Sequence, residues 1–274
     1  KKKIILWVLD LWPDTVIDLK IVKSSYLIWF LRKLVSYIYN NSDLILAQSK
    51  SIKSEIKKLT KTKCIYFPSW PEEFKKNNKN KAKEVISTNK LKILFAGNIG
   101  EAQSFETLIK CAKSMRYLNI VKWIIVGDGR WKKKLMHYIK INNLENQFQL
   151  ISNVPLKKID HFYNCADALY LGLKNNKTFR KTVPGKLQTY MSTGKPIIAS
   201  ISGEAKEIII DSQCGYVSDA EDYKMLKKNI IKFSKLKRYK KLILGKNGKK
   251  YSDKNFSKKQ ILKGLEKEIK LTLS

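Results

Sequence analysis

Between residues 91 and 220, short apolar segments alternate with longer amphipathic segments, and this alternation restricts the fold more than any other feature of the chain. The apolar segments predict strands and the amphipathic segments predict helices. The expected strands are 91–96, 122–126, 148–151, 168–171 and 196–200, and the expected helices are 104–115, 130–141, 156–165, 184–192 and 204–211. Because strand and helix alternate and crossovers are right-handed, we expect an α/β domain with a doubly wound parallel sheet.

The flanking segments have different patterns. Residues 1–71 contain strand-like and helix-like segments of their own, including an apolar helix at 26–39. Residues 72–90 are polar and predict an interdomain linker. Residues 221–274 are rich in lysine and helical in pattern, and packing of the last helix against the N-terminal part is left open.

The chain is strongly basic, with a formal net charge of +33. Only five of its 56 basic residues are arginines, at Arg32, Arg116, Arg130, Arg180 and Arg238. Proteins that recognise nucleic acids favour arginine because its guanidinium makes paired hydrogen bonds. We therefore interpret most of the charge as solvated surface, with an anionic membrane as the second interpretation and nucleic acid as the third.

The cysteines and histidines do not form a recognisable metal or catalytic pattern. The four cysteines are far apart, without a Cys-x-x-Cys pair, at Cys64, Cys111, Cys165 and Cys214. The only histidines, His137 and His161, both fall in expected helices. We expect no metal site, no cofactor and no histidine-based catalytic centre.

The loops after the strands are the places to look for chemistry, because ligands of doubly wound sheets bind at the carboxyl ends of the strands. Gly97, Asn98 and Gly100 follow the first strand and precede a helix. Such a turn presents N–H groups to a phosphate, although an ordinary glycine-rich turn explains it equally well. Gly127 begins a Gly-Asp-Gly turn after the second strand, which we interpret as a tight turn lining the cleft.

The third loop, residues 175–185, is the most informative. It leads into the helix 184–192, where Pro184 suits the first turn. Arg180 and Lys186 lie on either side of that helix start, and together with its free N–H groups they predict a diphosphate clamp. The alternative is a lysine-rich loop in a lysine-rich protein.

The fourth loop ends at Glu204. Its carboxylate has two interpretations that we weigh equally. It accepts hydrogen bonds from ribose or sugar hydroxyls, or it is a first-turn residue that interacts favourably with its own helix dipole.

Several of these segments together resemble the GT-B glycosyltransferases of family 4. The resemblance is found in the segments FAGNIGEAQSFETLI (95–109), IIVGDGR (124–130), TVPGKLQTYMSTGKPIIA (182–199), SGEAKEIIIDSQCGYV (202–217), WVLDLWPDT (7–15) and SDLILAQSKSI (42–52). They are most similar to the bacterial subgroup that adds amino- or deoxy-sugars to cell-surface polysaccharides. The resemblance implies a Rossmann-like nucleotide-sugar-binding domain at 91–220, preceded at 1–71 by the last part of a second, acceptor-binding Rossmann-like domain.

The resemblance also implies the chemistry. It implies transfer of a sugar from a nucleoside diphosphate sugar to a lipid-linked or polysaccharide acceptor, with retention of configuration and without a metal. Arg180 and Lys186 are the expected catalytic residues, because they would stabilise the leaving diphosphate. The residues expected to bind the donor are Gly97, Asn98 and Gly100 at the diphosphate, Gly127 in the cleft, Asn153 and Val154 at the base, and Thr189 and Glu204 at the ribose.

The chain departs from the family pattern in two ways. Many members carry two glutamates eight positions apart, and these positions hold Lys181 and Thr189 here. Only about 70 residues precede the expected linker. We therefore expect this chain to be a fragment of a longer protein. If the full-length protein begins where this chain begins, we expect it to be inactive or dependent on a partner.

We expect a cytoplasmic protein, with the inner face of the cytoplasmic membrane as an open location. The apolar segment 26–39 either lies in a membrane interface or is a buried helix. Two alternative functions are a nucleotide-sugar epimerase of the same fold and a basic nucleic-acid-binding protein. The shortage of histidines argues against the first, and the shortage of arginines argues against the second.

Overall fold

The larger of two parallel sheets has six strands. A computed structural model describes residues 2–18, 20–73 and 88–273. The strands are β4 (Leu91–Ala96), β5 (Val121–Val126), β6 (Phe148–Ile151), β7 (Ala168–Gly172), β8 (Ile197–Ser200) and β9 (Gly215–Ser218), in the order β6-β5-β4-β7-β8-β9. Every neighbouring pair is parallel. The predicted doubly wound α/β sheet is confirmed.

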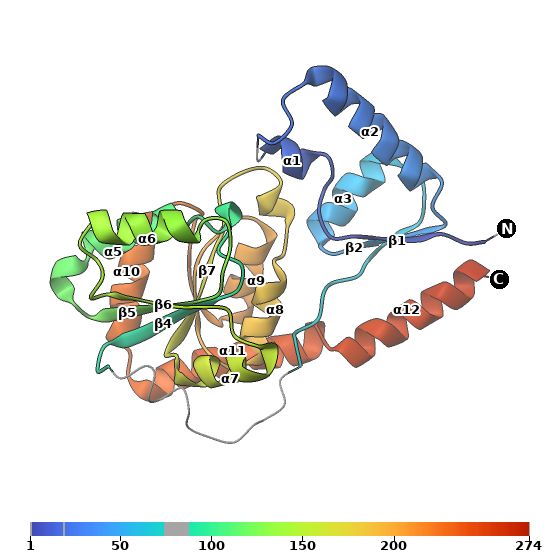
Figure 1. Cartoon of the computed structure of the whole chain (residues 1–274). Helices are drawn as coiled ribbons and strands as arrows, with labels where there is room; N and C mark the ends of the chain where they lie inside the picture. The colour runs from blue at the N-terminus through green and yellow to red at the C-terminus, as the bar shows by residue number, and fades with distance from the viewer. Residues whose placement is uncertain (1, 19, 74–87, 274) are drawn as a thin grey trace.

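Helices cover both faces of this sheet (Figure 1). Its helices are α5 (Phe105–Ser114), α6 (Lys132–Ile141), α7 (Leu156–Cys165), α8 (Gly185–Ser192), α9 (Glu204–Ser212), α10 (Tyr223–Ser234) and α11 (Arg238–Asn255). Helices α5, α6 and α10 share one apolar cluster with the strands, around the fully buried Trp123. Helices α7, α8 and α9 share the other cluster, around Tyr190. The alternating strands thus bury side chains on both faces, as parallel sheets require.

The smaller sheet has three strands, in the order β1-β2-β3, and is also parallel. Its strands are β1 (Ile5–Val8), β2 (Leu44–Ala47) and β3 (Cys64–Tyr66), and its helices are α1 (Asp14–Asp18), α2 (Ser25–Asn40) and α3 (Lys50–Leu59). Ile52 and Ile56 of α3 pack with Tyr39 of α2 against one face. The Ser49 side chain caps α3 by accepting a hydrogen bond from the Ile52 N–H.

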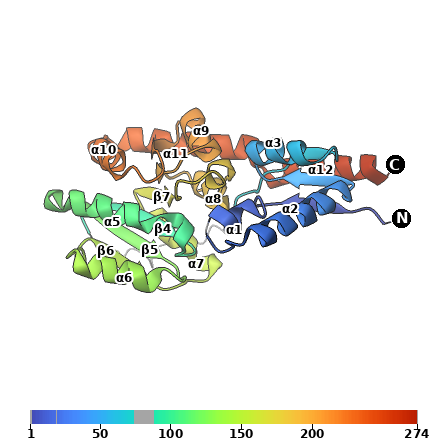
Figure 2. The ribbon, with the colours of Figure 1, turned by 90° about the horizontal axis from the view of Figure 1, so that it is seen from above.

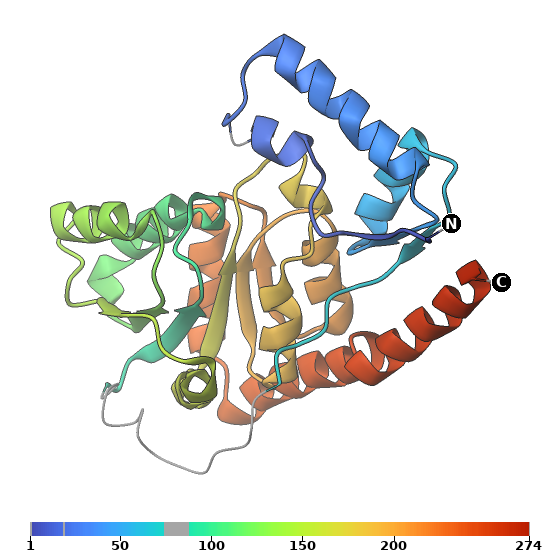
Figure 3. The same cartoon turned by 45° about the vertical axis from the view of Figure 1, so that its right-hand side comes forward.

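The last helix, α12 (Lys258–Leu273), leaves the larger sheet and runs along the smaller one (Figures 2 and 3). Ile261 and Leu265 pack against the cluster formed by Leu44, Leu46 and Phe67 on the face opposite α3. Lys63, directly before β3, forms an ion pair with Glu268 of this helix. The chain thus has two bodies: a smaller one around β1, β2 and β3, and a larger one around the six-stranded sheet. The C-terminal segment joins them.

Two elements differ from the sequence expectation. Residues 14–18 form the short helix α1, and residues 215–218 form the edge strand β9, and neither was among the expected elements. Both are short, and β9 pairs with β8 on only one side, so neither carries the apolar periodicity that predicts an element. Residues 74–87 of the expected linker lie outside the described residues.

Candidate functional site

The turns after β4 and β5 are packed against each other at the carboxyl edge of the larger sheet. The Ile99 N–H donates to the carbonyl oxygen of Asp128 at 2.7 Å. Gly127 has a φ of +144°, and a Cβ there would lie 2.0 Å from the carbonyl oxygen of Gly97. The second turn therefore braces the first one, and no side chain fits at position 127.

Lys186 reaches from α8 to the turn after β4. It lies in the first turn of α8, and a Cβ on Gly97 would be 2.5 Å from its Cε atom. The ammonium lies 5.3 Å from the centroid of the Phe95 ring. The missing side chain at position 97 thus leaves the space that the lysine occupies.

The charge of Lys186 is not compensated by a carboxylate. No ion pair or hydrogen bond to its ammonium occurs within 2–18, 20–73 and 88–273, and burial lowers its pKa. A desolvated cation is unfavourable unless an anion accompanies it. The N-terminus of α8 adds partial positive charge and free N–H groups. Lys186, Gly97 and the start of α8 therefore form a site suited to a phosphate.

Arg180 lies elsewhere on the same edge. Its Nε donates to the Oδ1 of Asn175 at 3.0 Å, and the residue is exposed. It also lies near Asp219, whose pKa is held low by Lys206 first and by Arg180 to a smaller extent. The Arg180 guanidinium is therefore engaged by Asn175 in this structure, and that Arg180 and Lys186 together clamp a diphosphate stays a prediction.

Glu204 has a role that neither sequence interpretation anticipated. It is buried, and its two carboxylate oxygens accept hydrogen bonds from the backbone N–H groups of Lys50 at 2.9 Å and Ser51 at 2.7 Å. These N–H groups belong to the first turn of α3, which is in the other body. The carboxylate therefore caps a helix of the N-terminal part, and this structure does not present it to a ribose.

Three other residues that we expected to bind the nucleotide sugar make contacts within the protein. The Gly100 N–H, expected to face the diphosphate, is buried and donates to the Oε1 of Gln103 at 3.0 Å. Thr189 is buried on α8, where its Oγ1 accepts a hydrogen bond from the Glu72 N–H at 3.3 Å. The Asn98 Oδ1 packs over Gly129. The Gly100 N–H and the Thr189 hydroxyl oxygen are thus used in hydrogen bonds within the protein.

Asn153 and Val154 lie where the resemblance implies the base. They follow β6, whose last residue Ile151 accepts a hydrogen bond from the Gly127 N–H at 3.0 Å. Asn153 is exposed, and Val154 is half-buried against the core. Both residues therefore share the carboxyl edge with Gly127, and their contact with a base stays a prediction.

The sequence interpretation missed the residues that the smaller sheet contributes. Gln48, directly after β2, donates through its amide to the carbonyl oxygen of Val183, and Ser49 donates to that of Lys181. Asp18 accepts a hydrogen bond from the Thr178 N–H at 3.0 Å. The position of Gln48 after a buried strand was the available signal, because that places a polar side chain at the carboxyl edge of its own sheet.

No group of three or more metal-ligating side chains occurs in the described ranges. That the reaction needs no metal therefore remains a prediction from the resemblance.

Comparison with known proteins gives the family. The family described as Glycosyl transferases group 1 matches residues 76–251. An uncharacterised glycosyltransferase of Methanocaldococcus jannaschii is 25% identical over 236 residues, which are 86% of this chain and 62% of that protein. The amylovoran biosynthesis glycosyltransferase AmsD of Erwinia amylovora is 24% identical over 139 residues, which are 50% of this chain and 39% of that protein. The chain thus spans only part of the length of these relatives.

Solved structures show the fold. The Anabaena protein HepE, crystallised with UDP and glucose, superimposes with a TM-score of 0.77 at 16% identity, covering 98% of this chain and 72% of that chain. WaaG, a glycosyltransferase of lipopolysaccharide biosynthesis, gives a TM-score of 0.70 at 14% identity, covering 91% and 70%. These likenesses show the GT-B fold, and the family match over residues 76–251 shows that this chain belongs to the group 1 glycosyl transferases.

Proposed function

We propose that this chain forms the donor-binding part of an enzyme that transfers a sugar from a nucleoside diphosphate sugar to a lipid-linked or polysaccharide acceptor in cell-surface glycan synthesis. The observation that carries the proposal is the uncompensated ammonium of Lys186 between Gly97 and the start of α8. A diphosphate supplies the negative charge that this site lacks.

The mechanism follows from the placement of positive charge. When the bond between the sugar and the diphosphate breaks, negative charge develops on the leaving diphosphate. Lys186 and the N-terminal N–H groups of α8 are positioned to stabilise that charge without reorganisation. Arg180, which lies on the loop before α8, is proposed to join them when the donor binds. No metal ion takes part in this proposal.

The names of similar proteins support the choice of donor and acceptor. HepE and the pneumococcal O-GlcNAc transferase GtfA were crystallised with UDP, which makes UDP the first nucleotide to test. AmsD acts in amylovoran biosynthesis and WaaG in lipopolysaccharide biosynthesis, and both names point to glycan acceptors.

Calorimetric titration tests the proposal. We expect saturable binding of UDP in the presence of EDTA, with inorganic pyrophosphate competing for the same site. Duplex DNA at 150 mM salt serves as the comparison, because charge alone binds it weakly and with strong salt dependence. Tight binding of DNA with no saturable binding of UDP, GDP or pyrophosphate would favour the nucleic-acid alternative instead.

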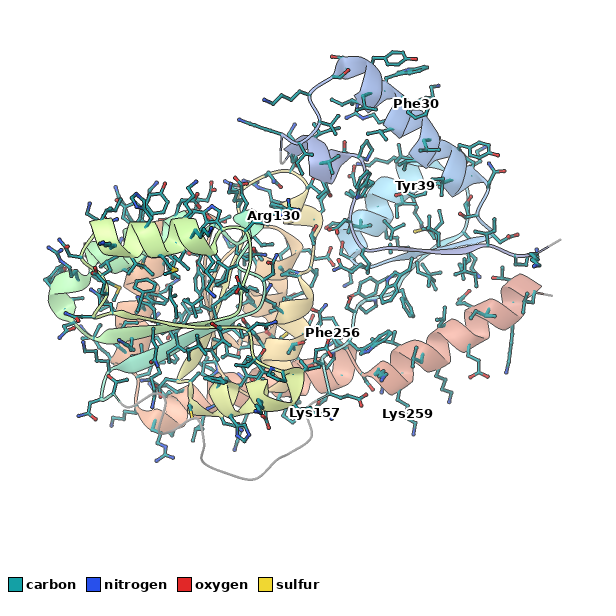
Figure 4. All side chains as sticks on the ribbon, viewed as in Figure 1. Phe30, Tyr39, Arg130, Lys157, Phe256 and Lys259 are labelled. Atoms are coloured by element: carbon teal, nitrogen blue, oxygen red, sulfur yellow. The ribbon has the colours of Figure 1, made fainter. Side chains whose placement is uncertain are left out.

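We also propose that the chain binds an anionic membrane surface, and the α2 helix supports this location. No helix among the described residues is long and apolar enough to cross a membrane. However, α2 exposes a stripe of large side chains, of which Tyr26 is 76%, Trp29 55% and Phe30 50% exposed. Figure 4 shows Phe30 on the outer side of α2 and Tyr39, only 4% exposed, toward the sheet. Aromatic side chains beside Arg32 and Lys33 suit an anionic lipid surface.

Replacing Trp29 and Phe30 together by serine is expected to weaken binding to vesicles that contain phosphatidylglycerol by about tenfold or more, because less apolar area is buried in the interface. Co-sedimentation with vesicles measures this binding. The matched control is Tyr117→Ser, which removes an aromatic side chain that is 75% exposed on the other body. Equal binding by the double variant and the wild type would remove α2 from the membrane interface.

A further inference from the structure

The turn between β2 and α3 is hydrogen-bonded to the loop at residues 175–185 of the other body, which we call the basic loop. The Gln48 side chain binds both backbone groups of one residue: its amide nitrogen donates to the Val183 carbonyl, and its Oε1 accepts from the Val183 N–H at 3.4 Å. Gln48 is 6% exposed, so water does not compete for these bonds. Val183 directly precedes Pro184, the N-cap of α8, and Lys186 follows in the first turn.

A second set of bonds holds the residue two positions earlier. The Ser49 hydroxyl donates to the Lys181 carbonyl while it caps α3. The Lys181 ammonium forms an ion pair with Glu55 of α3 at 3.1 Å. The backbone from Lys181 to Val183 is therefore attached to the first turns of α3 through both main-chain and side-chain groups.

Glu204 closes the arrangement from the opposite side. Its carboxylate holds the first turn of α3 through the N–H groups of Lys50 and Ser51. Gly203, directly before it, has a φ of +76°, and a Cβ there would lie 1.8 Å from the carbonyl oxygen of Arg180. The basic loop is thus confined between the start of α9 and the start of α3.

We propose that Gln48 and Glu204 are positioning residues of the donor site: they hold the loop 178–183 through the first turn of α3 and thereby fix Lys186 over Gly97. The proposal rests on the proposed function, because it assigns these residues to the binding of a diphosphate. The physical reason is the ordering of the loop. A loop that must be ordered when the diphosphate binds lowers the observed affinity by the free energy of that ordering.

Glu204→Gln tests the proposal, because the proposal and simple electrostatics predict opposite changes in the affinity for UDP. An amide accepts through one oxygen only, and its NH₂ group opposes the second backbone N–H of α3. We expect UDP to bind about five- to tenfold more weakly, the equivalent of one lost hydrogen bond. Electrostatics alone predicts the opposite result, because the substitution removes a negative charge near a site for an anion.

Glu207→Gln is the matched control. Glu207 lies on the same helix, is exposed, and loses the same charge on substitution. Weaker UDP binding by the variant at position 204, with unchanged or tighter binding by the variant at 207, supports the proposal. Unchanged or tighter binding by both variants overturns it.

Hydrogen–deuterium exchange of the wild-type chain and of Gln48→Ala gives a readout without nucleotide. We expect the amides of 178–186 to exchange about tenfold faster in the variant, because Val183 loses both of its hydrogen bonds to the Gln48 side chain. Thr62→Ala is the control, since Thr62 donates to the Tyr39 carbonyl within the smaller body. Wild-type exchange in Gln48→Ala overturns the proposal. A wild-type chain that binds neither UDP nor pyrophosphate overturns the proposed function, and the exchange experiment then decides separately whether Gln48 holds the loop.

Discussion

Lys186→Ala is expected to reduce turnover of the complete enzyme about 10²- to 10³-fold, equivalent to about 2–4 kcal/mol of transition-state stabilisation. The physical reason is that Lys186, in the first turn of α8, lies against the Gly97 turn, where it is proposed to stabilise the negative charge of the leaving diphosphate. UDP binding by this chain should weaken as well, since the ground-state diphosphate carries negative charge. Product formation and calorimetric titration measure the two effects.

The control for this variant is Lys110→Ala, which removes an exposed lysine of α5. It should bind UDP as the wild type does, because surface charges at a distance are screened by salt. Unchanged turnover in Lys186→Ala would exclude Lys186 from the catalytic site.

Removing the charge of Lys186 should make the folded chain more stable, although it lowers activity. Burial lowers the pKa of Lys186 in the folded protein, so the unfolded chain binds a proton at this position more readily than the folded chain does. Its charge therefore destabilises the folded state at neutral pH, and this penalty decreases as the pH rises through the lowered pKa. Lys186→Met should accordingly be more stable than the wild type at pH 7, with a difference that shrinks toward alkaline pH, while UDP binding is lost.

Gly127→Ala is expected to lower the free energy of unfolding by about 3 kcal/mol or more. The added Cβ would lie 2.0 Å from the Gly97 carbonyl oxygen and 3.0 Å from its carbonyl carbon, which are backbone atoms that cannot rotate away. The φ of +144° adds strain for any residue with a side chain. The turns after β4 and β5 would have to separate, so UDP binding should be lost as well.

Urea unfolding followed by tryptophan fluorescence measures this change, because Trp123 and Trp131 are buried in the affected body. The matched control is Gly264→Ala on α12, where an added Cβ meets nothing within 4 Å. That variant should be as stable as the wild type or more stable by up to about 1 kcal/mol, since alanine favours a helix. A wild-type unfolding midpoint for Gly127→Ala would show that the two turns are not held together as described.

The sequence alone was sufficient for most of the larger sheet. Strands β4, β5, β7 and β8 carry mostly apolar segments because both faces of these strands are buried, and that pattern is visible without a structure. Strand β9 was missed because Gly215–Ser218 is short, partly polar and lies at an edge. The short helix α1 was missed for the same reason, since five residues are too few to show a helical period.

For the candidate site too, the sequence indicated some of the contacts, and only the tertiary structure decided the others. That Gly97 and Lys186 lie at one site was implied by the family resemblance, and the parallel sheet brings the loops after its strands to one edge. That Gln48 binds Val183 and Glu204 caps α3 was decided by the tertiary structure. Those partners lie 135 and 153–154 residues apart, in two different bodies of the chain. Local periodicity determines which residues form a strand or a helix, but only the packing of the two bodies determines which buried polar groups become each other's partners.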